Sequence, residues 1–414
     1  MKAVQLLRFG EPDVLDVANV PKPLVGRGEA LIRVEASGVN FTDTRMRQNS
    51  YVVTPPLPSI LGGEVAGVIE SLGPGVEGLE VGDRVAGSLF AAGRLFGGYS
   101  QYVALAADFV TPIPDALPFE HAVALMVQGI TAFYLLRQAP VSGRRVFISA
   151  AAGGVGTLLL QLAKRAGATQ VIAAASSPEK RAFVSALGAD ETVDYTAPRW
   201  SQRVRELTQG AGVDVIYESS GGTTTLESMK ALAPLGRLIV YGASNAGGLA
   251  LGAAELTGLI FGNQSITGFA LVPLLTPQGL RDALGSLFSM AIAGELKVTI
   301  GGAFPLEKAA DAHRALESRQ SRGKSCWSRT SCFGSTKLND LRTAVIEEKR
   351  QGARSCVRKS SRVSHFRACR PKAFEGPRSP YPGEKPGPIC SSGGLRVARS
   401  ATCTSSPSPH AIRS

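Results

Sequence analysis

Residues 149–168 read SAAAGGVGTLLLQLAKRAGA, and this stretch decides the expected fold. The apolar run before it, VFISA (146–150), predicts a buried strand, and the residues from about Val155 to Ala166 predict a helix. A strand, a glycine-rich turn and a helix in this order make up the phosphate-binding unit of dinucleotide-binding folds. Small residues let the chain approach a pyrophosphate, and the helix N-terminus offers it free N–H groups.

The glycine pattern departs from the usual fingerprint at one place. Ala151 stands where the first glycine of G-x-G-x-x-G is expected, while Gly153 and Gly156 keep the other two positions. A glycine pattern alone is weak evidence, but this one has a strand before it and a helix after it. We therefore predict a cofactor site, with a purely structural turn as the alternative.

Strands and helices alternate along the middle of the chain. The runs 171–176, 213–219 and 237–243 are further strand candidates, and this alternation predicts an α/β fold with a doubly wound parallel sheet. Residues 1–124 instead show short β-type runs broken by glycine and proline. The uncharged run 146–163 fits a buried strand, loop and helix better than a membrane span. Without a signal-peptide pattern, we expect a soluble, cytoplasmic protein with no membrane partner.

Charge and cysteine content divide the chain near Lys324. Lys and Arg outnumber Asp and Glu by 17 to 5 after this residue, whereas residues 1–324 hold 28 of each. All 6 cysteines also follow Lys324. The earlier part therefore has no thiolate nucleophile, no disulfide and no cysteine ligand for zinc.

The end of the second predicted strand bears on the choice of nucleotide. NAD enzymes usually carry an Asp or Glu there, whereas this chain has the sequence ASSPEK (175–180). Two hydroxyls and Lys180 suit a 2′-phosphate, so we favour NADP(H) over NAD(H). Glu179 is the counter-argument, and Ser177 with its neighbours also reads as a helix N-cap.

Nine stretches, in this order, resemble the zinc-independent quinone oxidoreductase (zeta-crystallin-like) family of the medium-chain dehydrogenase/reductase superfamily. They are GVNFTDTRMRQNSY (38–51), LGGEVAGVIESLGPGVEGLEVGDRVAG (61–87), GGYSQYV (97–103), GITAFYLL (129–136), AAGGVG (151–156), SSPEKRAFVSALGADETVDY (176–195), YESSGG (217–222), LAPLGRLIVYG (232–242) and ESRQSRGK (317–324). The resemblance implies a GroES-like catalytic domain from 1–124 and 269–324, a Rossmann NADP-binding domain over 125–268, and a homodimer or homotetramer.

The resemblance also implies the cofactor contacts, taken position by position. Near the pyrophosphate and nicotinamide it places Thr131, Gly153, Gly154, Val155, Gly242, Ala243, Ser244 and Phe269; around the adenosine and its phosphates it places Ser176, Lys180, Tyr195 and Arg319. Zinc-using relatives carry Cys where Asn40 stands and His where Gly63 stands, and Glu64 alone makes no site. We therefore expect no metal.

Reduction of a conjugated carbonyl needs only hydrogen-bond donors near the developing negative charge. The family pattern near Asn40 implies Asn40 and Tyr51 as polar groups in the cleft, with Asp43 orienting its neighbours. A plain ion pair between Asp43 and Arg47 is the alternative. His121 and His313 are expected to be structural or surface residues.

Residues 325–414 form the predicted tail, which is basic and expected to be disordered. The family continues after Gly-Lys with an apolar strand such as VVLVP, whereas this chain has SCWSR (325–329). Dropping one base from GTC GTG CTG GTC CCG yields codons for SCWSR, which suggests a frameshift and a lost terminal strand. The alternative is a real basic arm for nucleic acid, although we expect no nucleic-acid partner.

These observations favour an NADPH-dependent reductase that transfers hydride to a quinone or another conjugated carbonyl. One alternative is a 2-enal or enoyl-thioester reductase of the same fold. The other is a non-catalytic NADPH-binding protein, since fold alone does not decide function.

Overall fold

The structure is a computed structural model that describes residues 1–242 and 250–329. All of these belong to one compact unit. Ala243 and Ser244, and the tail from residue 330, lie outside the described residues.

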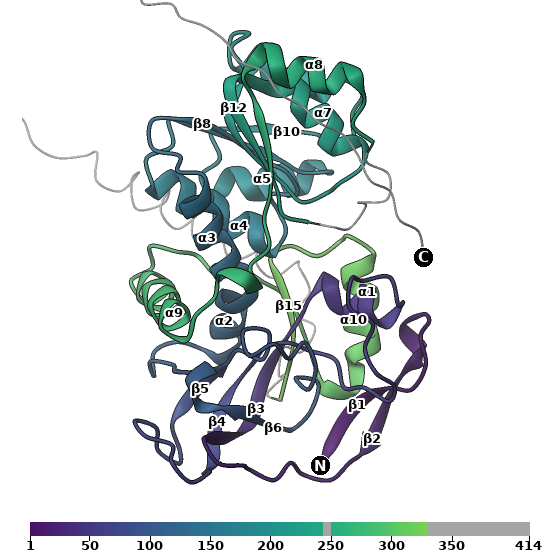
Figure 1. Cartoon of the computed structure of the whole chain (residues 1–414), viewed down its shortest axis with the longest axis vertical. Helices are drawn as coiled ribbons and strands as arrows, with labels where there is room; N and C mark the ends of the chain where they lie inside the picture. The colour runs from purple at the N-terminus through teal and green to yellow at the C-terminus, as the bar shows by residue number, and fades with distance from the viewer. Residues whose placement is uncertain (243–249, 330–414) are drawn as a thin grey trace, which may run out of the picture. The chain divides into compact units, whose positions relative to one another are not determined.

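The N-terminal part is built from β-strands, as its sequence predicts. Its strands are β1 (Lys2–Leu6), β2 (Leu15–Asn19), β3 (Glu29–Val39), β4 (Val65–Leu72), β5 (Arg84–Gly87), β6 (Tyr102–Ala106) and β7 (Val110–Pro112). β1 and β2 pair as a hairpin, and the larger sheet has the order β14-β15-β3-β4-β5-β7, with β6 also paired to β3 (Figure 1). The short helix α1 (Phe41–Arg47) follows β3 directly.

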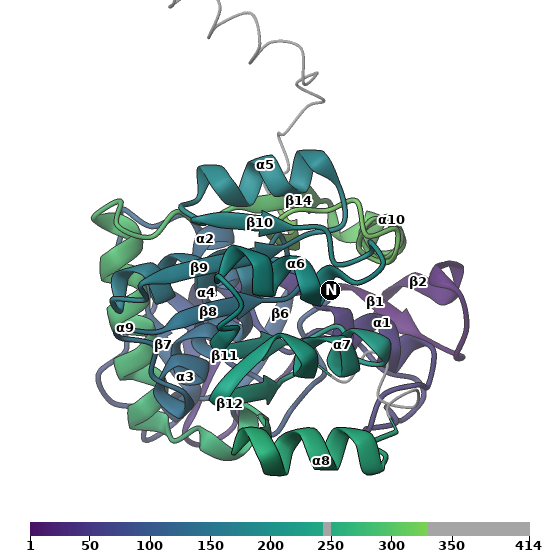
Figure 2. The ribbon, with the colours of Figure 1, turned by 90° about the horizontal axis from the view of Figure 1, so that it is seen from above.

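The middle of the chain forms the predicted doubly wound sheet. In chain order its elements are β8 (Arg145–Ile148), α4 (Gly154–Arg165), β9 (Gln170–Ala174), α5 (Pro178–Ala186), β10 (Glu191–Val193), α6 (Trp200–Leu207), β11 (Val213–Glu218), α7 (Thr223–Ala231), β12 (Leu232–Val240), α8 (Ala253–Gly262) and β13 (Ser265–Gly268). The strands pair in parallel in the order β10-β9-β8-β11-β12-β13, and Figure 2 shows most of them side by side between α5 and α8. The order in which strands are added to the sheet reverses between β8 and β11, the switch point at which Rossmann folds bind their ligand.

A long apolar helical stretch links the two sheets. It consists of α2 (Phe119–Ala124), a π-helical turn over Leu125–Ile130 and α3 (Thr131–Gln138). In the described part of the chain this stretch is the one helix long and apolar enough to cross a membrane, with 56% of its apolar window buried. Since Leu125, Met126 and Ile130 belong to the main hydrophobic core, it reads as the core helix of a globular fold.

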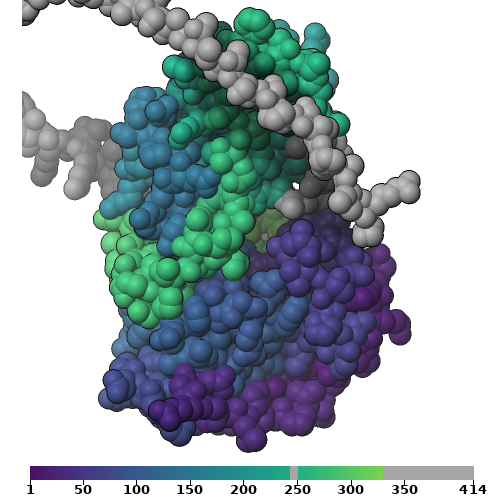
Figure 3. Space-filling model, viewed as in Figure 1, coloured from purple at the N-terminus to yellow at the C-terminus, as the bar shows by residue number. Residues whose placement is uncertain are grey.

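The chain then returns to the first sheet through α9 (Pro277–Ile292), β14 (Ile300–Phe304), α10 (Ala309–Glu317) and β15 (Lys324–Ser328). Residues such as Leu284 and Leu287 of α9 join the same core as Leu125, and Figure 3 shows α9 on the surface beside that region. Single 3-10 turns occupy Pro12–Val14, Ala107–Phe109, Val272–Leu274 and Leu306–Lys308.

The expected loss of the terminal strand is wrong for residues 325–328. They form β15 with Lys324, pairing parallel to β14 and antiparallel to β3. Strand pairing uses backbone groups, which any residue except proline offers in full. The side chains alternate between faces, so Cys326 enters one hydrophobic core and Trp327 enters another. The ordered strand therefore extends beyond Lys324, where the tail was expected to begin.

Candidate active site

Asn40 stands at the junction of β3 and α1, and its backbone geometry follows from the local sequence. It is the N-cap of α1, and Asp43, three residues later, accepts the Asn40 N–H at 2.8 Å. This is a capping box, which the spacing Asn-x-x-Asp provides. The cap fixes the direction in which the Asn40 side chain leaves the strand.

The Asn40 amide is held by three side chains from separate elements. Its Oδ1 accepts hydrogen bonds from Gln128 Nε2 and from Lys324 Nζ, each at 2.7 Å, and its Nδ2 donates to Glu64 Oε1 at 2.9 Å. These partners distinguish the amide oxygen from the amide nitrogen. One hydrogen on Nδ2 is left without an assigned bond, on a residue that is 6% exposed.

Glu64 and Lys324 form a buried ion pair at the same point. Lys324 Nζ lies 2.6 Å from Glu64 Oε1, and both side chains are almost completely buried. Glu64 Oε2 accepts the backbone N–H of Val127 at 2.7 Å, inside the π-helical turn. Such turns occur mostly as single widened turns inside α-helices and are frequent at functional sites.

These residues do not fit a catalytic zinc. Asn40, Gly63 and Glu64 offer neither a thiolate nor an imidazole, and the Lys324 ammonium contacts both Asn40 and Glu64. Within 1–242 and 250–329, no three His, Cys, Asp or Glu side chains come together as a metal site. A positively charged amine thus lies among the positions that hold metal in zinc-using relatives.

A second buried chain of hydrogen bonds runs behind Asn40. The Tyr99 hydroxyl donates to Asp43 Oδ2 at 3.1 Å and lies 3.0 Å from His313 Nε2. Burial raises the pKa of Asp43 to about 7 and lowers the pKa of His313 to about 3. His313 is therefore structural and buried, one of the two roles expected for it, and is not a surface residue.

The alternative pairing of Asp43 with Arg47 does not form. The Arg47 guanidinium is fully buried and binds Glu317 on α10 at 2.5 Å, while Asp43 binds Tyr99 and the Asn40 backbone. Tyr51 is half-buried, and burial together with the charge of Asp43 raises its pKa.

The glycine turn meets the return segment directly. Gly153 is the N-cap of α4, and the Gly323 N–H donates to Ala152 O at 2.9 Å. A Cβ on Gly156 would lie 2.6 Å from Ala151 Cα, so only glycine permits this contact between helix and turn. The turn is therefore packed closely against α4, which is the role of the third glycine in the dinucleotide fingerprint.

The residues predicted near the adenosine phosphate gather at the end of β9. Ser177 caps α5 with its side chain, as the alternative interpretation of this stretch proposed. Burial raises the pKa of Tyr195, an effect that the neighbouring Ser176 side chain opposes, and Lys180 Nζ donates to the backbone oxygen of Arg319. Burial and then the charges of Arg322 and Arg319 lower the pKa of Lys180. Glu179 is exposed.

The residues predicted near the nicotinamide are only partly described. Thr131 is buried at the start of α3, Val155 lies in the first turn of α4, and Gly242 follows β12. A Cβ on Gly242 would lie 2.2 Å from Ser219 O. Ala243 and Ser244 cannot be placed because they lie outside the described residues.

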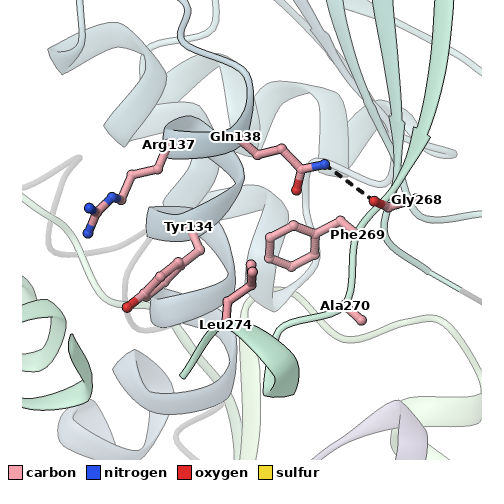
Figure 4. Close-up of a pocket in the computed structure, with 7 residues that line it drawn as sticks. All are labelled: Tyr134, Arg137, Gln138, Gly268, Phe269, Ala270 and Leu274. Atoms are coloured by element: carbon pink, nitrogen blue, oxygen red, sulfur yellow. Dashed lines mark hydrogen bonds between the residues drawn. The ribbon is translucent and has the colours of Figure 1, made fainter. Parts of the chain in front are cut away.

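Phe269 lines a surface pocket of about 450 Å³ between α3 and the segment after β13. Figure 4 shows its ring facing this pocket together with Tyr134 and Leu274. Gln138 closes one side through a 3.3 Å hydrogen bond to Gly268 O. This pocket is separate from the polar cluster around Asn40, which shares none of its lining residues.

Sequence reasoning did not find several residues of the two polar groups. These are Gln128, Lys324 and Tyr99 near Asn40 and Asp43, and Arg322 beside Lys180. Glu64 was considered only as a metal ligand. Each of the others lies in a matched stretch or beside one, but none carries a local motif. The signal for them is three-dimensional, since it consists of burial combined with convergence on Asn40 or Lys180.

Known proteins match nearly the whole described part of the chain. Residues 26–115 match the family described as Alcohol dehydrogenase GroES-like domain, and residues 154–286 match Zinc-binding dehydrogenase. A quinone oxidoreductase of Pseudomonas aeruginosa is 38% identical over 331 residues, which cover 78% of this chain and 98% of that protein. A 2-haloacrylate reductase of Burkholderia is 36% identical and covers 78% and 97%.

Among solved structures, Escherichia coli quinone oxidoreductase complexed with NADPH is 30% identical, with a TM-score of 0.74. The match covers 79% of this chain and 100% of that one. The fold, the glycine turn and the length of the matched sequence therefore all indicate the same family. The chain belongs to the quinone oxidoreductase family of the medium-chain dehydrogenase/reductase superfamily and is an oxidoreductase.

Proposed function

We propose that the chain is an NADPH-dependent reductase that transfers hydride to a quinone or a related conjugated carbonyl. The observation that carries this proposal is the Asn40 amide, which is oriented by Gln128, Glu64 and Lys324 and keeps one donor hydrogen unassigned. A fixed donor can stabilise an oxygen on which negative charge develops. The donor set does not fit a metal, so the proposal involves no metal.

The described residues fit NADP(H). The close-packed turn Gly153–Gly156 and the N-terminus of α4 suit a pyrophosphate. At the adenosine end, Lys180, Arg319 and Arg322 lie together, and burial and then the repulsion of the two arginine charges lower the pKa of Lys180. A phosphate dianion between them would relieve this repulsion, which a ribose hydroxyl does not do. The cofactor of the family is NADP(H), as in its NADPH-complexed members.

When bound, NADPH supplies the hydride. The protein's part is to orient an acceptor carbonyl, with Asn40 donating a hydrogen bond and the half-buried Tyr51 offering its hydroxyl nearby. Asp43 holds the backbone of Asn40, and Glu64 and Lys324 hold its side chain. The reduced quinone also takes up one proton, which solvent or the Tyr51 hydroxyl would supply.

The direct test follows NADPH oxidation by the purified protein with 1,4-quinones, 2-enals, enoyl-thioesters and 2-haloacrylates as acceptors. We expect turnover with a quinone. Turnover with 2-haloacrylate alone would assign the chain to the activity named for its Burkholderia relative. NADPH binding without any turnover would support the non-catalytic alternative.

Cofactor preference tests the cation cluster separately. Lys180→Ala combined with Arg322→Ala is expected to weaken NADPH binding by about tenfold or more, because charge-assisted bonds to the 2′-phosphate are lost. NADH binding should change little. Arg137→Ala, on the pocket of Figure 4, is a matched control with a cation removed elsewhere. Equal losses for both nucleotides would contradict a 2′-phosphate site.

We also propose a homodimer that forms at the β13 edge of the parallel sheet. In the described residues β13 pairs on one side only, with β12. The neighbouring helix α8 exposes Leu256, Ile260 and Phe261, the last at 84%. An open strand edge beside an apolar patch favours association with a second copy. Light scattering should show a dimer that Phe261→Glu dissociates; a monomeric wild type would exclude it.

A cytoplasmic location remains a prediction.

A further inference from the structure

One polar atom beside Asn40 has no partner. Gln128 donates through Nε2 to Asn40 Oδ1 at 2.7 Å, yet its own Oε1 is buried without a hydrogen-bond donor. The residue is 9% exposed. Buried side-chain oxygens nearly always accept a hydrogen bond, because an unmade bond carries the full loss of hydration.

The orientation of the Gln128 amide is determined by its neighbours. Asn40 Oδ1 also accepts from the Lys324 ammonium, and Asn40 Nδ2 donates to Glu64, so Asn40 must present its oxygen to Gln128. Reversing the Gln128 amide would place two acceptor oxygens against each other. The unpartnered atom is therefore the amide oxygen, and it requires a donor.

The surroundings of Gln128 point to the cofactor as that donor. Its side chain packs on the first residue of α4, since a Cβ on Gly154 would lie 2.7 Å from Gln128 Cγ. Gln128 also sits in the π-helical turn, three residues before Thr131. It thus lies between the phosphate-binding turn and Asn40. The nicotinamide half of NADPH carries donors of the required kind, namely ribose hydroxyls and the carboxamide NH₂.

We propose that Gln128 Oε1 accepts a hydrogen bond from the nicotinamide half of NADPH while Gln128 Nε2 positions Asn40. This inference rests on the proposed function, since it requires NADPH to occupy the cleft. One amide then contacts both the hydride donor and the residue that orients the acceptor. Binding of the cofactor and alignment of Asn40 are coupled through a single side chain.

The test is Gln128→Met, which keeps the length of the side chain and removes both polar atoms. Binding is measured by calorimetry with NADPH and with adenosine 2′,5′-bisphosphate, which lacks both the nicotinamide and its ribose. We expect NADPH to bind about fivefold more weakly, the usual effect of one neutral hydrogen bond, and adenosine 2′,5′-bisphosphate to bind as in the wild type. No change for NADPH, or equal losses for both ligands, would overturn the proposal.

Asn40→Ala separates the two halves of the Gln128 amide. It removes the partner of Nε2 but keeps the Gln128 amide, so NADPH affinity should fall by less than in Gln128→Met. An NADPH loss as large as that of Gln128→Met would show that Gln128 acts only through Asn40. Failure of the wild type to bind NADPH while it binds NADH would instead refute the proposed cofactor. Binding without turnover would refute only the proposed reaction.

Discussion

The cluster around Asn40 and the strand β15 share Lys324. Both are buried, but they differ in how well their buried polar atoms are provided with hydrogen-bond partners. In the cluster, Asn40, Glu64 and Lys324 give every charged or amide group at least one partner. In β15, Ser325 Oγ and Trp327 Nε1 are buried without any partner. Apart from Gln128 Oε1, the first region has polar groups matched to one another, whereas the second holds two buried polar atoms that have no partner.

The difference shows that a strand position can be filled by backbone pairing alone. β15 pairs with β14 and β3 along its length, although its side chains differ from the apolar strand typical of the family. The cluster has no such tolerance, because each of its bonds requires a particular side chain. A frameshift directly after Lys324 would thus leave the site complete and the strand slot filled by unsuitable side chains.

Breaking the cluster should have the largest effect. Lys324→Met leaves the Glu64 carboxylate buried without its cation, which is expected to lower the free energy of unfolding by about 3–5 kcal/mol. Lys164→Met is the matched control, since its pair with Asp190 is about one-third exposed and should contribute about 0–1 kcal/mol. Urea unfolding measures both. Equal losses would mean that burial adds nothing to the cluster.

The pH dependence of stability should separate Asp43 from His313. The pKa of Asp43 is about 7 in the folded protein and 3.8 when unfolded. The stability that this difference contributes is fully present below about pH 4 and is lost as the pH rises through 7. The lowered pKa of His313, about 3 against 6.5, acts oppositely: its contribution is present above pH 6.5 and is lost as the pH falls through 3. Each effect amounts to about 4–5 kcal/mol, so in the wild type they largely cancel.

Single substitutions of Asp43 and His313 should reveal the two opposing pH dependences of the free energy of unfolding. Between pH 4 and 7, Asp43→Asn should become more stable with rising pH than the wild type does, whereas His313→Gln should become less stable. Both replacements can keep hydrogen bonds to Tyr99. The measurement is the free energy of unfolding at several pH values. Parallel curves for both variants and the wild type would show that neither group shifts on folding.

Much of the fold was predictable because its signals are local. The stretch 146–166 predicted β8 and α4, and the alternation after it predicted a parallel sheet. The short α8 and β13 carry weaker signals and were not anticipated. β15 was predicted to be lost, because side-chain composition was taken as the criterion when backbone pairing decides.

The site was predictable only where a motif spans a few residues. Asn40 and Asp43 belong to one capping box, and the glycine turn is continuous. The partners that orient Asn40 come from Glu64, Gln128 and Lys324, which lie 24, 88 and 284 residues away along the chain. No local pattern connects such positions. His313 has no partner in its own helix, and its role is visible only through Tyr99.

The smallest expected effect is the difference in stability between substitutions of two serines on neighbouring strands. Ser37 Oγ donates to Glu64 O at 2.7 Å, whereas Ser325 Oγ has no partner, and both residues are buried. Ser37→Ala should therefore destabilise the protein by about 1 kcal/mol, while Ser325→Ala should be neutral or stabilise it by up to about 1 kcal/mol. Replacing 325–328 by Val-Val-Leu-Val extends the test, and should raise the melting temperature by about 2–4 °C. If Ser325→Ala destabilises as much as Ser37→Ala, or if the apolar strand leaves the melting temperature unchanged, β15 already suits its slot and the contrast with the cluster fails.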